Sequence, residues 1–315
     1  MPDAVELQEQ PESAHMYMIA GWRQWADAGS ISSGLPQYLV RHTGARQIGT
    51  IKPDGFYLFQ IPGTHDLVRP VVKFEDGFPQ PLETPHNELF YTGDDERGVV
   101  IMLGDEPHLD IERYVRAVLD VAQTLSVERI VTLGGVYGEL PYNKERTVSA
   151  IYSQPALRKE LDELAVTFSD YNGGASIGSF ISRRAHERDQ AAVGFYAFVP
   201  TYDFSSIDPL GNAIRLENDF MAWLGVMLRI NYMLKTRFDL SELEQRSQQL
   251  IRVVDAKVDE MDRSAPQLGI RDYMTQLAAD FDEVTFDPLG DVWQEELRRL
   301  FDDSETGEDT PDEQT

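Results

Sequence analysis

Residues 99–135 read VVIMLGDEPHLDIERYVRAVLDVAQTLSVERIVTLGG, and this stretch decides the fold. It opens with five apolar residues between Gly98 and Gly104, a pattern typical of a strand that is covered on both faces. Residues 111–125 then carry apolar side chains at three- and four-residue spacing behind Asp110, which predicts an amphipathic helix with Asp110 as its N-cap. A second apolar run, 129–133, ends at a double glycine, so the stretch predicts a strand, a helix and a second strand.

This order predicts a βαβ unit, with the two strands as parallel neighbours joined by a right-handed crossover. Ligands in open α/β sheets favour the carboxyl ends of the strands. We therefore expect residues 103–108 (LGDEPH) and 133–141 (LGGVYGELP) to lie side by side at the edge of a pocket.

The rest of the chain extends this α/β pattern and then changes character. Apolar runs predict further strands at 17–20, 47–51, 55–61, 67–74, 166–169 and 191–199. Helical spacing predicts helices at 30–41, 154–164 and 177–187, and one from Pro209 to Lys235. From residue 240 to 261 the apolar residues form one helical stripe, followed by helical stretches near 273–281 and 292–301 with no strand between them.

We therefore predict an α/β core domain over residues 15–235 and a helical extension over 236–303. The apolar stripe of the extension packs either on the α/β body or on another subunit. The leader, 1–14, and the acidic tail, 304–315, are predicted to be disordered.

Composition narrows the functional classes. The 315 residues have a net charge of −26, and no basic patch offsets it, so binding to nucleic acid or to an anionic membrane is not expected. The absence of cysteine excludes disulfides, thiolate catalysis and iron–sulfur clusters. No basic, apolar signal segment opens the chain, and no apolar run reaches the roughly 18 residues that span a bilayer. These features predict a cytoplasmic protein.

The stretch NGGASIGSF, 172–180, contains the G-x-S-x-G pattern of a hydrolase nucleophile elbow around Ser176. The preceding apolar run stops near Phe168, too early for an elbow. The histidine that follows, His186, lies on the same predicted helix with no acid in between, so a triad in hydrolase order is not available. A triad that borrows His86 or His108 from earlier in the chain stays open, because triads are defined by geometry.

Two other interpretations of the same stretch remain. Gly173 and Gly178 have the glycine spacing of a P-loop, but Ser179 stands where the phosphate-binding lysine belongs. The glycines either permit a tight turn into a helix or present free N–H groups to a small anion. Ser176 is expected to be a hydrogen-bond donor there and not a nucleophile.

Acidic residues near the first strand end offer a second chemistry. Glu106 and His108 could act as an acid/base pair, with Asp105 adding charge. The alternative is a helix entry in which acids are favourable near the N-terminal end. With no H-E-x-x-H motif and only six dispersed histidines, no metal and no cofactor are predicted.

Six short motifs occur in a fixed order along the chain. They are GWRQWADAG (21–29), Arg69-Pro70, Leu103-Gly104 with Glu106-Pro107, Leu133-Gly134-Gly135, the glycine loop 171–178, and Val199-Pro200 with Tyr202. In these motifs the sequence resembles the proteasome assembly chaperone 2 family, in its bacterial and archaeal branch and in a longer form with a C-terminal helical extension. The resemblance covers about residues 15–235.

The resemblance implies a phosphorylase/hydrolase-like α/β fold, similar to purine nucleoside phosphorylases, with a sheet flanked by helices. It implies a homotrimer, no established reaction, and a protein partner, which in archaeal and eukaryotic relatives is a proteasome subunit. Two positions depart from the family pattern. Residues 141–144 read PYNK where many relatives carry Pro-His-Thr-Arg, and the chain ends in DEQT instead of the hydrophobic-Tyr-any ending that docks some archaeal relatives on the proteasome.

Two hypotheses follow. The first is an oligomeric, chaperone-like or protein-binding module without established catalysis. The second is an enzyme or small-molecule binder for a nucleoside, a phosphate or a carboxylate, with its pocket at the carboxyl ends of the strands. The candidate pocket residues, from the strand-end pattern and the resemblance, are Asp27, Gly29, Glu106, His108, Gly134, Gly135, Glu139, Asn172, Gly173, Gly174, Ser176 and Tyr202.

Overall fold

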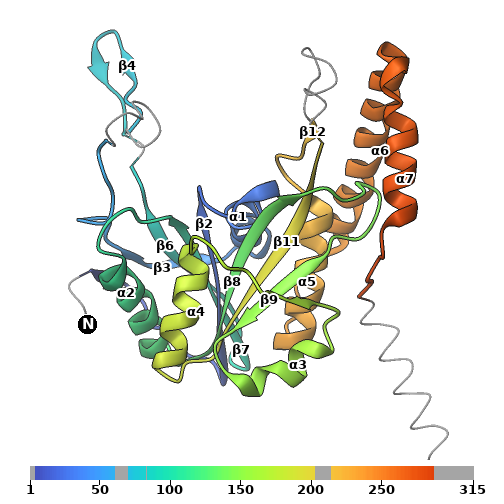
Figure 1. The fold of residues 1–315 in the computed structure, drawn as a ribbon. Coiled ribbons are helices and arrows are strands. Elements are labelled where there is room, and N and C mark those ends of the chain that lie inside the picture. Colours follow the sequence, from blue (N-terminus) through green and yellow to red (C-terminus); the bar gives the residue numbers. More distant parts are fainter. Residues whose placement is uncertain (1–3, 61–69, 83, 203–213, 287–315) are drawn as a thin grey trace, which may run out of the picture.

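The computed structural model describes residues 4–60, 70–82, 84–202 and 214–286. A large central sheet is covered by helices on both faces, and two further helices follow at the C-terminal side (Figure 1). The predicted α/β class with a helical C-terminal part is therefore confirmed.

The sheet has ten strands with a parallel centre and antiparallel flanks. Its order is β1 (Val5–Leu7), β3 (Arg46–Ile51), β6 (Asn87–Gly93), β7 (Arg97–Asp105), β2 (His15–Arg23), β8 (Val127–Gly138), β11 (Ala192–Tyr202), β9 (Val148–Tyr152) and β10 (Thr167–Phe168), and β12 (Ile214–Arg215) also pairs with β11. Strands β7, β2, β8 and β11 are mutually parallel, so their carboxyl ends meet at one edge of the sheet. We call this the C-terminal edge.

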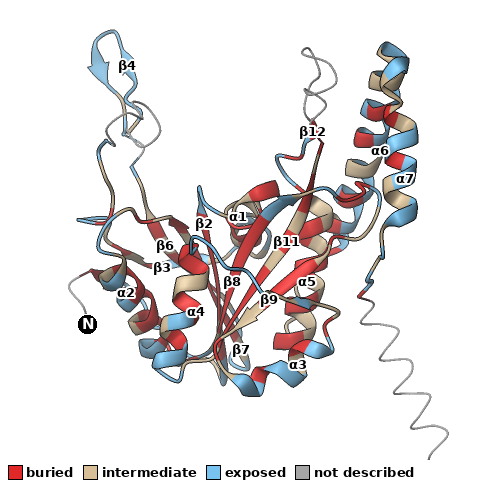
Figure 2. Ribbon diagram, viewed as in Figure 1, coloured by how far each residue is buried: buried red, intermediate tan, exposed pale blue. Residues whose placement is uncertain are grey.

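Helices cover the two faces of the sheet as two separate layers. Helices α2 (Ile111–Thr124) and α4 (Ile177–Glu187) pack on one face, whereas α1 (Gly34–Thr43), the short α3 (Arg158–Asp162) and α5 (Phe220–Leu234) pack on the other. Successive side chains of a strand point to opposite faces of the sheet, so each belongs to one of two hydrophobic clusters. Met18 of β2 lies in the cluster beneath α2 (the α2 cluster), and its neighbour Ile19 lies in the cluster beneath α5 (the α5 cluster). Both are fully buried, and the central strands are the most buried part of the molecule (Figure 2).

The predicted pairing of the two strands in the βαβ unit is wrong. Strand β2 lies between β7 and β8 and pairs in parallel with both of them. The connection through α2 therefore passes over one intervening strand. The physical reason is that β2 is apolar on both faces and fills the centre of the sheet, which a pattern confined to residues 99–135 does not reveal.

Other boundaries also differ from the sequence predictions. Residues 5–7 of the predicted disordered leader form β1, which pairs with β3 and buries Ala4 and Val5. Residues 55–60 form turns and not a strand, and β6 was not predicted. Helix α5 begins at Phe220, with Asp219 as its N-cap, and not at Pro209, which lies outside the described residues. The predicted helix at 292–301 and the acidic tail lie outside them as well.

Three structures rise beyond the C-terminal edge and surround it (Figure 1). The first is a hairpin of β4 (Phe74–Glu75) and β5 (Phe78–Pro79), whose strands pair only with each other. The second is the end of β11 with β12. The third is the pair formed by α6 (Ser241–Ser264) and α7 (Ile270–Asp280).

The helical extension packs on the α/β body within the same chain. Leu243 and Val258 from the apolar stripe of α6 are fully buried in the α5 cluster, together with Ile270 at the start of α7. Polar contacts fix it further: Tyr142 Oη donates to Asp255 Oδ1 at 2.6 Å, and Lys144 Nζ pairs with Glu283 Oε2 at 2.8 Å. Because core residues are shared, the division at residue 235 stays a prediction.

A buried ion pair joins the body to α5. Arg146 and Asp219 are 1% and 0% exposed, and Arg146 Nε donates to Asp219 Oδ2 at 2.7 Å. Arg146 Nη1 also donates to the carbonyl oxygens of Pro141, Tyr142 and Lys144, at 3.1, 3.1 and 2.7 Å. Four protein oxygens thus replace water around Nε and Nη1, whereas Nη2 is buried without an acceptor among the described residues.

Asp219→Ala should therefore destabilise the fold by about 3–5 kcal/mol, because it leaves the Arg146 charge buried without its partner. Urea unfolding at neutral pH measures this loss. Asp162→Ala removes the partner of Arg158 in an exposed ion pair and is the control, with an expected cost below about 1 kcal/mol. Equal costs for the two variants would contradict the role assigned to the buried pair.

Candidate functional site

The C-terminal edge is built around the segment that follows β2, residues 24–30. Gly135 N, three residues before the end of β8, donates to Ala26 O at 2.7 Å, and Asp27 forms a parallel bridge with Gly135. A Cβ atom at Gly135 would lie 2.0 Å from Ala28 O, so this close approach of two backbones requires glycine. The double glycine therefore serves to seat the 24–30 segment on β8.

The 24–30 segment holds an unusual backbone conformation. Gln24, Ala26 and Ser30 have positive φ values, as does Gly29, within seven residues. Left-handed conformations of residues with a Cβ cost on the order of 1 kcal/mol each, and surrounding contacts must stabilise them. Such strained segments are concentrated at functional sites, which makes this segment a candidate.

Asp27 supplies part of that stabilisation. Its Oδ1 accepts hydrogen bonds from Ser32 N and Ser33 N, both at 2.9 Å, and its Oδ2 accepts one from Ser33 Oγ at 2.6 Å. Burial raises the pKa of Asp27, although these hydrogen bonds act in the opposite direction. The carboxyl group is therefore committed to the turn into α1.

Gly29 connects the same segment to α5. Its carbonyl oxygen accepts from Asp219 N at 3.0 Å and from Trp223 Nε1 at 2.9 Å. A Cβ atom at Gly29, where φ is +61°, would lie 2.8 Å from Asp219 Cβ. The segment is thus held from two sides, by β8 and by α5.

Glu106 is the side chain at this edge with the most altered chemistry. Its Oε1 accepts from Ile177 N, in the first turn of α4, at 3.0 Å, and its Oε2 is buried without a partner among the described residues. Burial raises the pKa of Glu106 to about 7, while the Ile177 and Trp25 amides favour the charged form. The carboxyl group can thus exchange a proton near neutral pH, as general acids and bases do.

Ser176 is the N-cap of α4. Its Oγ accepts from Ser179 N at 3.3 Å and lies 2.9 Å from Tyr196 Oη. Among the described residues, no histidine hydrogen-bonds to Ser176; His186 Nδ1 lies 2.7 Å from Ser153 O instead. These contacts support the interpretation of the glycine loop as a helix entry. A nucleophilic Ser176 would need a histidine base, and no described histidine contacts it.

His108 does not pair with Glu106. Leu58 N donates to His108 Nδ1 at 3.2 Å, and His108 Nε2 lies 3.3 Å from Gln24 Oε1. Burial lowers the pKa of His108. Asp105 accepts from Arg23 Nε at 2.7 Å and from Arg23 Nη2 at 2.8 Å, so its charge is already paired.

The structure brings together some of the predicted pocket residues and separates others. Asp27, Gly29 and Gly135 meet around the 24–30 segment, and Glu106 meets the start of α4 beside Ser176. The remaining residues have other surroundings. Gly134 lies against the Tyr196 ring, and Tyr202 Oη donates to Leu140 O at 2.5 Å. Glu139 accepts from Tyr273 of α7, and the three residues 172–174, Asn172, Gly173 and Gly174, lie in an exposed loop. A single pocket that contains all of them stays a prediction.

Sequence reasoning missed the exposed aromatic residues of this edge. Trp25 is 59% exposed, and Val136 and Tyr137, at the end of β8, are 40% and 43% exposed. On the hairpin that rises beside the edge, Phe74 and Phe78 are also mostly exposed. The sequence carried this signal, because Trp25 comes two residues after β2 and Tyr137 is the next-to-last residue of β8.

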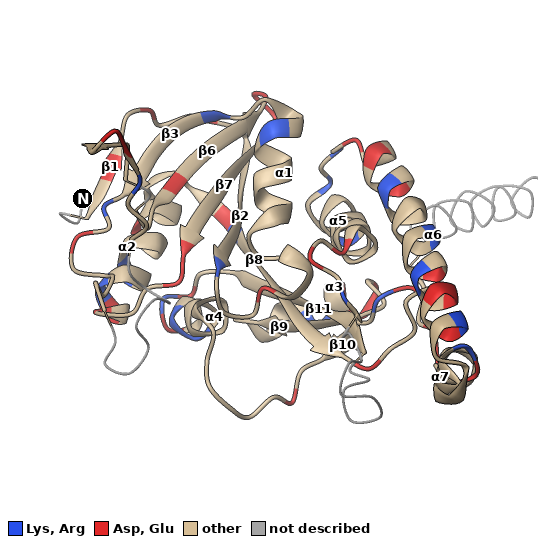
Figure 3. Cartoon of the chain, turned by 90° about the horizontal axis from the view of Figure 1, so that it is seen from above, with Lys and Arg blue, Asp and Glu red and all other residues tan. Residues whose placement is uncertain are grey.

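Charge is distributed differently on the extension. Acidic and basic residues follow one another along α6, whereas the strands carry few charged residues when the molecule is seen from above (Figure 3). Within the described ranges, His, Asp and Glu form no group of three that could hold a metal ion. No helix among the same residues is both long and apolar enough to cross a bilayer.

Comparisons with known proteins agree on a family. A sequence model described as the PAC2 family matches residues 22–258. No curated protein is found to match the chain.

Several solved structures share the fold. A proteasome-assembly chaperone homologue from Mycobacterium tuberculosis has a TM-score of 0.65 at 21% identity, over 76% of this chain and 94% of its own. A PAC2 family protein from Streptomyces avermitilis has a TM-score of 0.64 at 23% identity, over 79% and 97%. An archaeal proteasome activator from Pyrococcus furiosus has a TM-score of 0.57 at 17% identity, over 80% and 97%.

The raised pKa of Glu106 predicts a pH dependence of stability. The folded protein favours the protonated acid, so this contribution to stability is fully present below the ordinary pKa of 4.5 and is lost as the pH rises through about 7. Glu106→Gln stays neutral and keeps an acceptor for Ile177 N. It should therefore be more stable than the wild type above pH 8, by about 1–2 kcal/mol after allowance for partial exposure.

Unfolding free energies between pH 5 and pH 9 measure this difference. Glu163→Gln, at an exposed glutamate with no side-chain partner in the described part of the chain, should leave the pH profile unchanged. If the difference in unfolding free energy between Glu106→Gln and the wild type does not grow with pH, the pKa of Glu106 is not raised.

Proposed function

The chain belongs to the PAC2 family, and from this premise we propose that it is an oligomeric, cytoplasmic protein-binding or chaperone-like module that acts without catalysis of its own. The observation that carries this proposal is the exposure of three large apolar side chains at the C-terminal edge, Trp25, Val136 and Tyr137. We call these three residues the edge surface.

The edge surface has the composition of a protein interface. Aromatic residues are enriched at the centre of such interfaces and provide most of their binding energy. Apolar side chains that gather at a surface mark interaction sites. Here Trp25 lies within the strained 24–30 segment, and Val136 and Tyr137 follow the residue of β8 that pairs with that segment. The rising hairpin, with exposed Phe74 and Phe78, would give a partner a second point of contact.

The relatives point to the kind of partner. One of the similar structures is a proteasome-assembly chaperone homologue and another is an archaeal proteasome activator, so a subunit of a large protein assembly is the partner class we propose. The homotrimer is likewise proposed from the family resemblance. The net charge of −26 favours a partner whose contact surface is basic around an apolar centre.

A second candidate function, binding or conversion of a small molecule at the same edge, is favoured by Glu106. A buried carboxyl group with a free oxygen beside a helix N-terminus suits a ligand that donates a hydrogen bond. The ligand classes expected from the sequence are nucleosides, phosphate and carboxylates.

Co-purification tests the first proposal. Tagged wild-type protein from its source should retain a protein partner, and Trp25→Ala combined with Tyr137→Ala should reduce the recovery of that partner at least tenfold, because aromatic interface residues commonly contribute 2 kcal/mol or more. Light scattering on the purified chain should give three times the mass of 35.7 kDa.

Val253→Ala is the control, because Val253 is 55% exposed on α6 and is not one of the three residues of the edge surface. Recovery of a metabolite without any protein partner would overturn the proposal.

A thermal-shift screen with nucleosides, phosphate and amino acids tests the second candidate. A ligand that binds at this edge should raise the thermal unfolding midpoint of the wild type and of Glu163→Ala. It should not raise the midpoint of Glu106→Ala. Stabilisation that persists in Glu106→Ala would remove Glu106 from the ligand site.

A further inference from the structure

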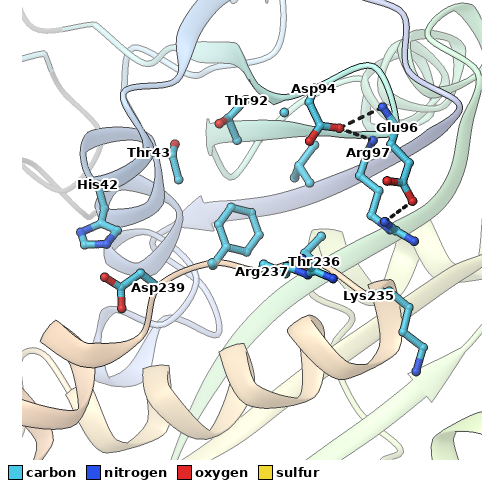
Figure 4. Close-up of a pocket in the computed structure, with 13 residues that line it drawn as sticks. His42, Thr43, Thr92, Asp94, Glu96, Arg97, Lys235, Thr236, Arg237 and Asp239 are labelled. Carbon is cyan, nitrogen blue, oxygen red and sulfur yellow. Dashed lines mark hydrogen bonds and ion pairs between the residues drawn. The ribbon is translucent and has the colours of Figure 1, made fainter.

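A hollow of about 730 Å3 opens at the end of the molecule opposite the C-terminal edge. It lies between the turn from β6 to β7, the last residues of α1 and the connection from α5 to α6, residues 235–239 (Figure 4). Nothing in the proposed function uses this hollow, so its chemistry is a separate question.

The acidic residues around the hollow are all engaged. Asp94 Oδ1 accepts from Glu96 N at 2.9 Å and from Arg97 N at 2.8 Å, and Glu96 pairs with Arg97 Nη1 at 2.6 Å. Asp239 Oδ1 accepts from Ser241 N at 3.0 Å at the start of α6. Their carboxylate oxygens thus already accept hydrogen bonds from backbone amides or from a guanidinium nitrogen.

The basic residues are less fully paired. Arg237 has no ion pair or hydrogen bond to any other described residue, and Arg97 Nη2 has none either. Arg97 Nε is buried and also lacks an acceptor among them. Lys235 is different: its ammonium lies 4.3 Å from the centre of the Tyr232 ring, and its side chain points away from Arg97 (Figure 4).

Two further features of the hollow define what Arg237, and the Arg97 nitrogens that Glu96 leaves free, could bind. The Thr92 hydroxyl, which has no partner in the described part of the chain, adds a further donor to the wall. Val99 and Phe238 provide an apolar floor. Guanidinium groups bind carboxylate and phosphate oxygens in pairs, so the donor set is that of an oxyanion site.

We propose that this hollow binds a small organic oxyanion, in which a carboxylate or phosphate group meets Arg237 and Arg97 while an apolar body rests on Phe238 and Val99. The two arginines approach the hollow from different segments, the α5–α6 connection and the start of β7. A bound anion supplies the acceptors that both groups lack.

Binding of phenyl phosphate and benzoate, measured by isothermal titration calorimetry on the full chain, tests the proposal. At least one of the two anions should bind saturably, and Arg237→Ala should weaken that binding at least tenfold without changing the unfolding midpoint. Arg252→Ala, which removes the same charge from an exposed position on α6, should bind as the wild type does. Benzylamine, a cation of similar shape, should not bind.

Three results would overturn the oxyanion site: no saturable binding of either anion, equal binding by Arg237→Ala and the wild type, or equal binding of benzylamine. Because the probes bind far from Trp25 and Tyr137, the double variant of the edge surface should keep the site intact. Failure of the protein-binding proposal is thus distinguishable from failure of this one.

Discussion

The buried ion pair between Arg146 and Asp219 is the interaction on which the arrangement of the C-terminal edge depends. Arg146 gathers three carbonyl oxygens from the segment that follows β8, and Asp219 caps α5 by accepting from Ala222 N at 3.1 Å. Through its backbone amide, Asp219 also holds Gly29 of the strained segment. This one buried ion pair therefore fixes the segment that follows β8, the start of α5 and the 24–30 segment of the candidate site. Its energetic value lies in this specificity, because desolvation offsets much of the attraction between the charges.

The residues beside that pair attach the helical extension. Tyr142 and Lys144 bind Asp255 and Glu283, and Glu145 Oε1 accepts from Phe286 N at 3.3 Å. Tyr142 and Lys144 occupy the stretch in which the sequence departs from the Pro-His-Thr-Arg pattern of many relatives. The structure gives this departure a physical reason: in a chain with an extension, these positions serve as its attachment points and are not free for chemistry.

Local sequence patterns predicted most helices and strands well. The main errors concerned which strands, distant in sequence, pair with one another. Helix α4 was predicted with its observed bounds, and α2 within one residue, since amphipathic spacing and caps are local properties. The insertion of β2 between β7 and β8 depends on which buried strand is most apolar on both faces, a comparison across the whole chain. At the site, Ser176 as a helix entry followed from the missing triad partners. The raised pKa of Glu106 could not be predicted from the sequence, because burial of its carboxyl group depends on α4 and on residue 25, which are distant in sequence.

The two candidate binding regions lie at opposite ends of the same strand. Strand β7 begins at Arg97, beside the oxyanion hollow, and ends at Asp105, next to Glu106. At about 3.3 Å per residue, the nine residues of this strand separate the regions by roughly 30 Å. The strand is buried along most of its length and paired on both sides, so it has no second arrangement through which occupancy of one end could reach the other. Two helical routes also join the regions. The α5–α6 connection lines the hollow and leads into the extension, and α1 ends at the hollow and begins beside Ser33, which binds Asp27. Any coupling between an anion and a protein partner would therefore have to pass through these helices and not through the sheet.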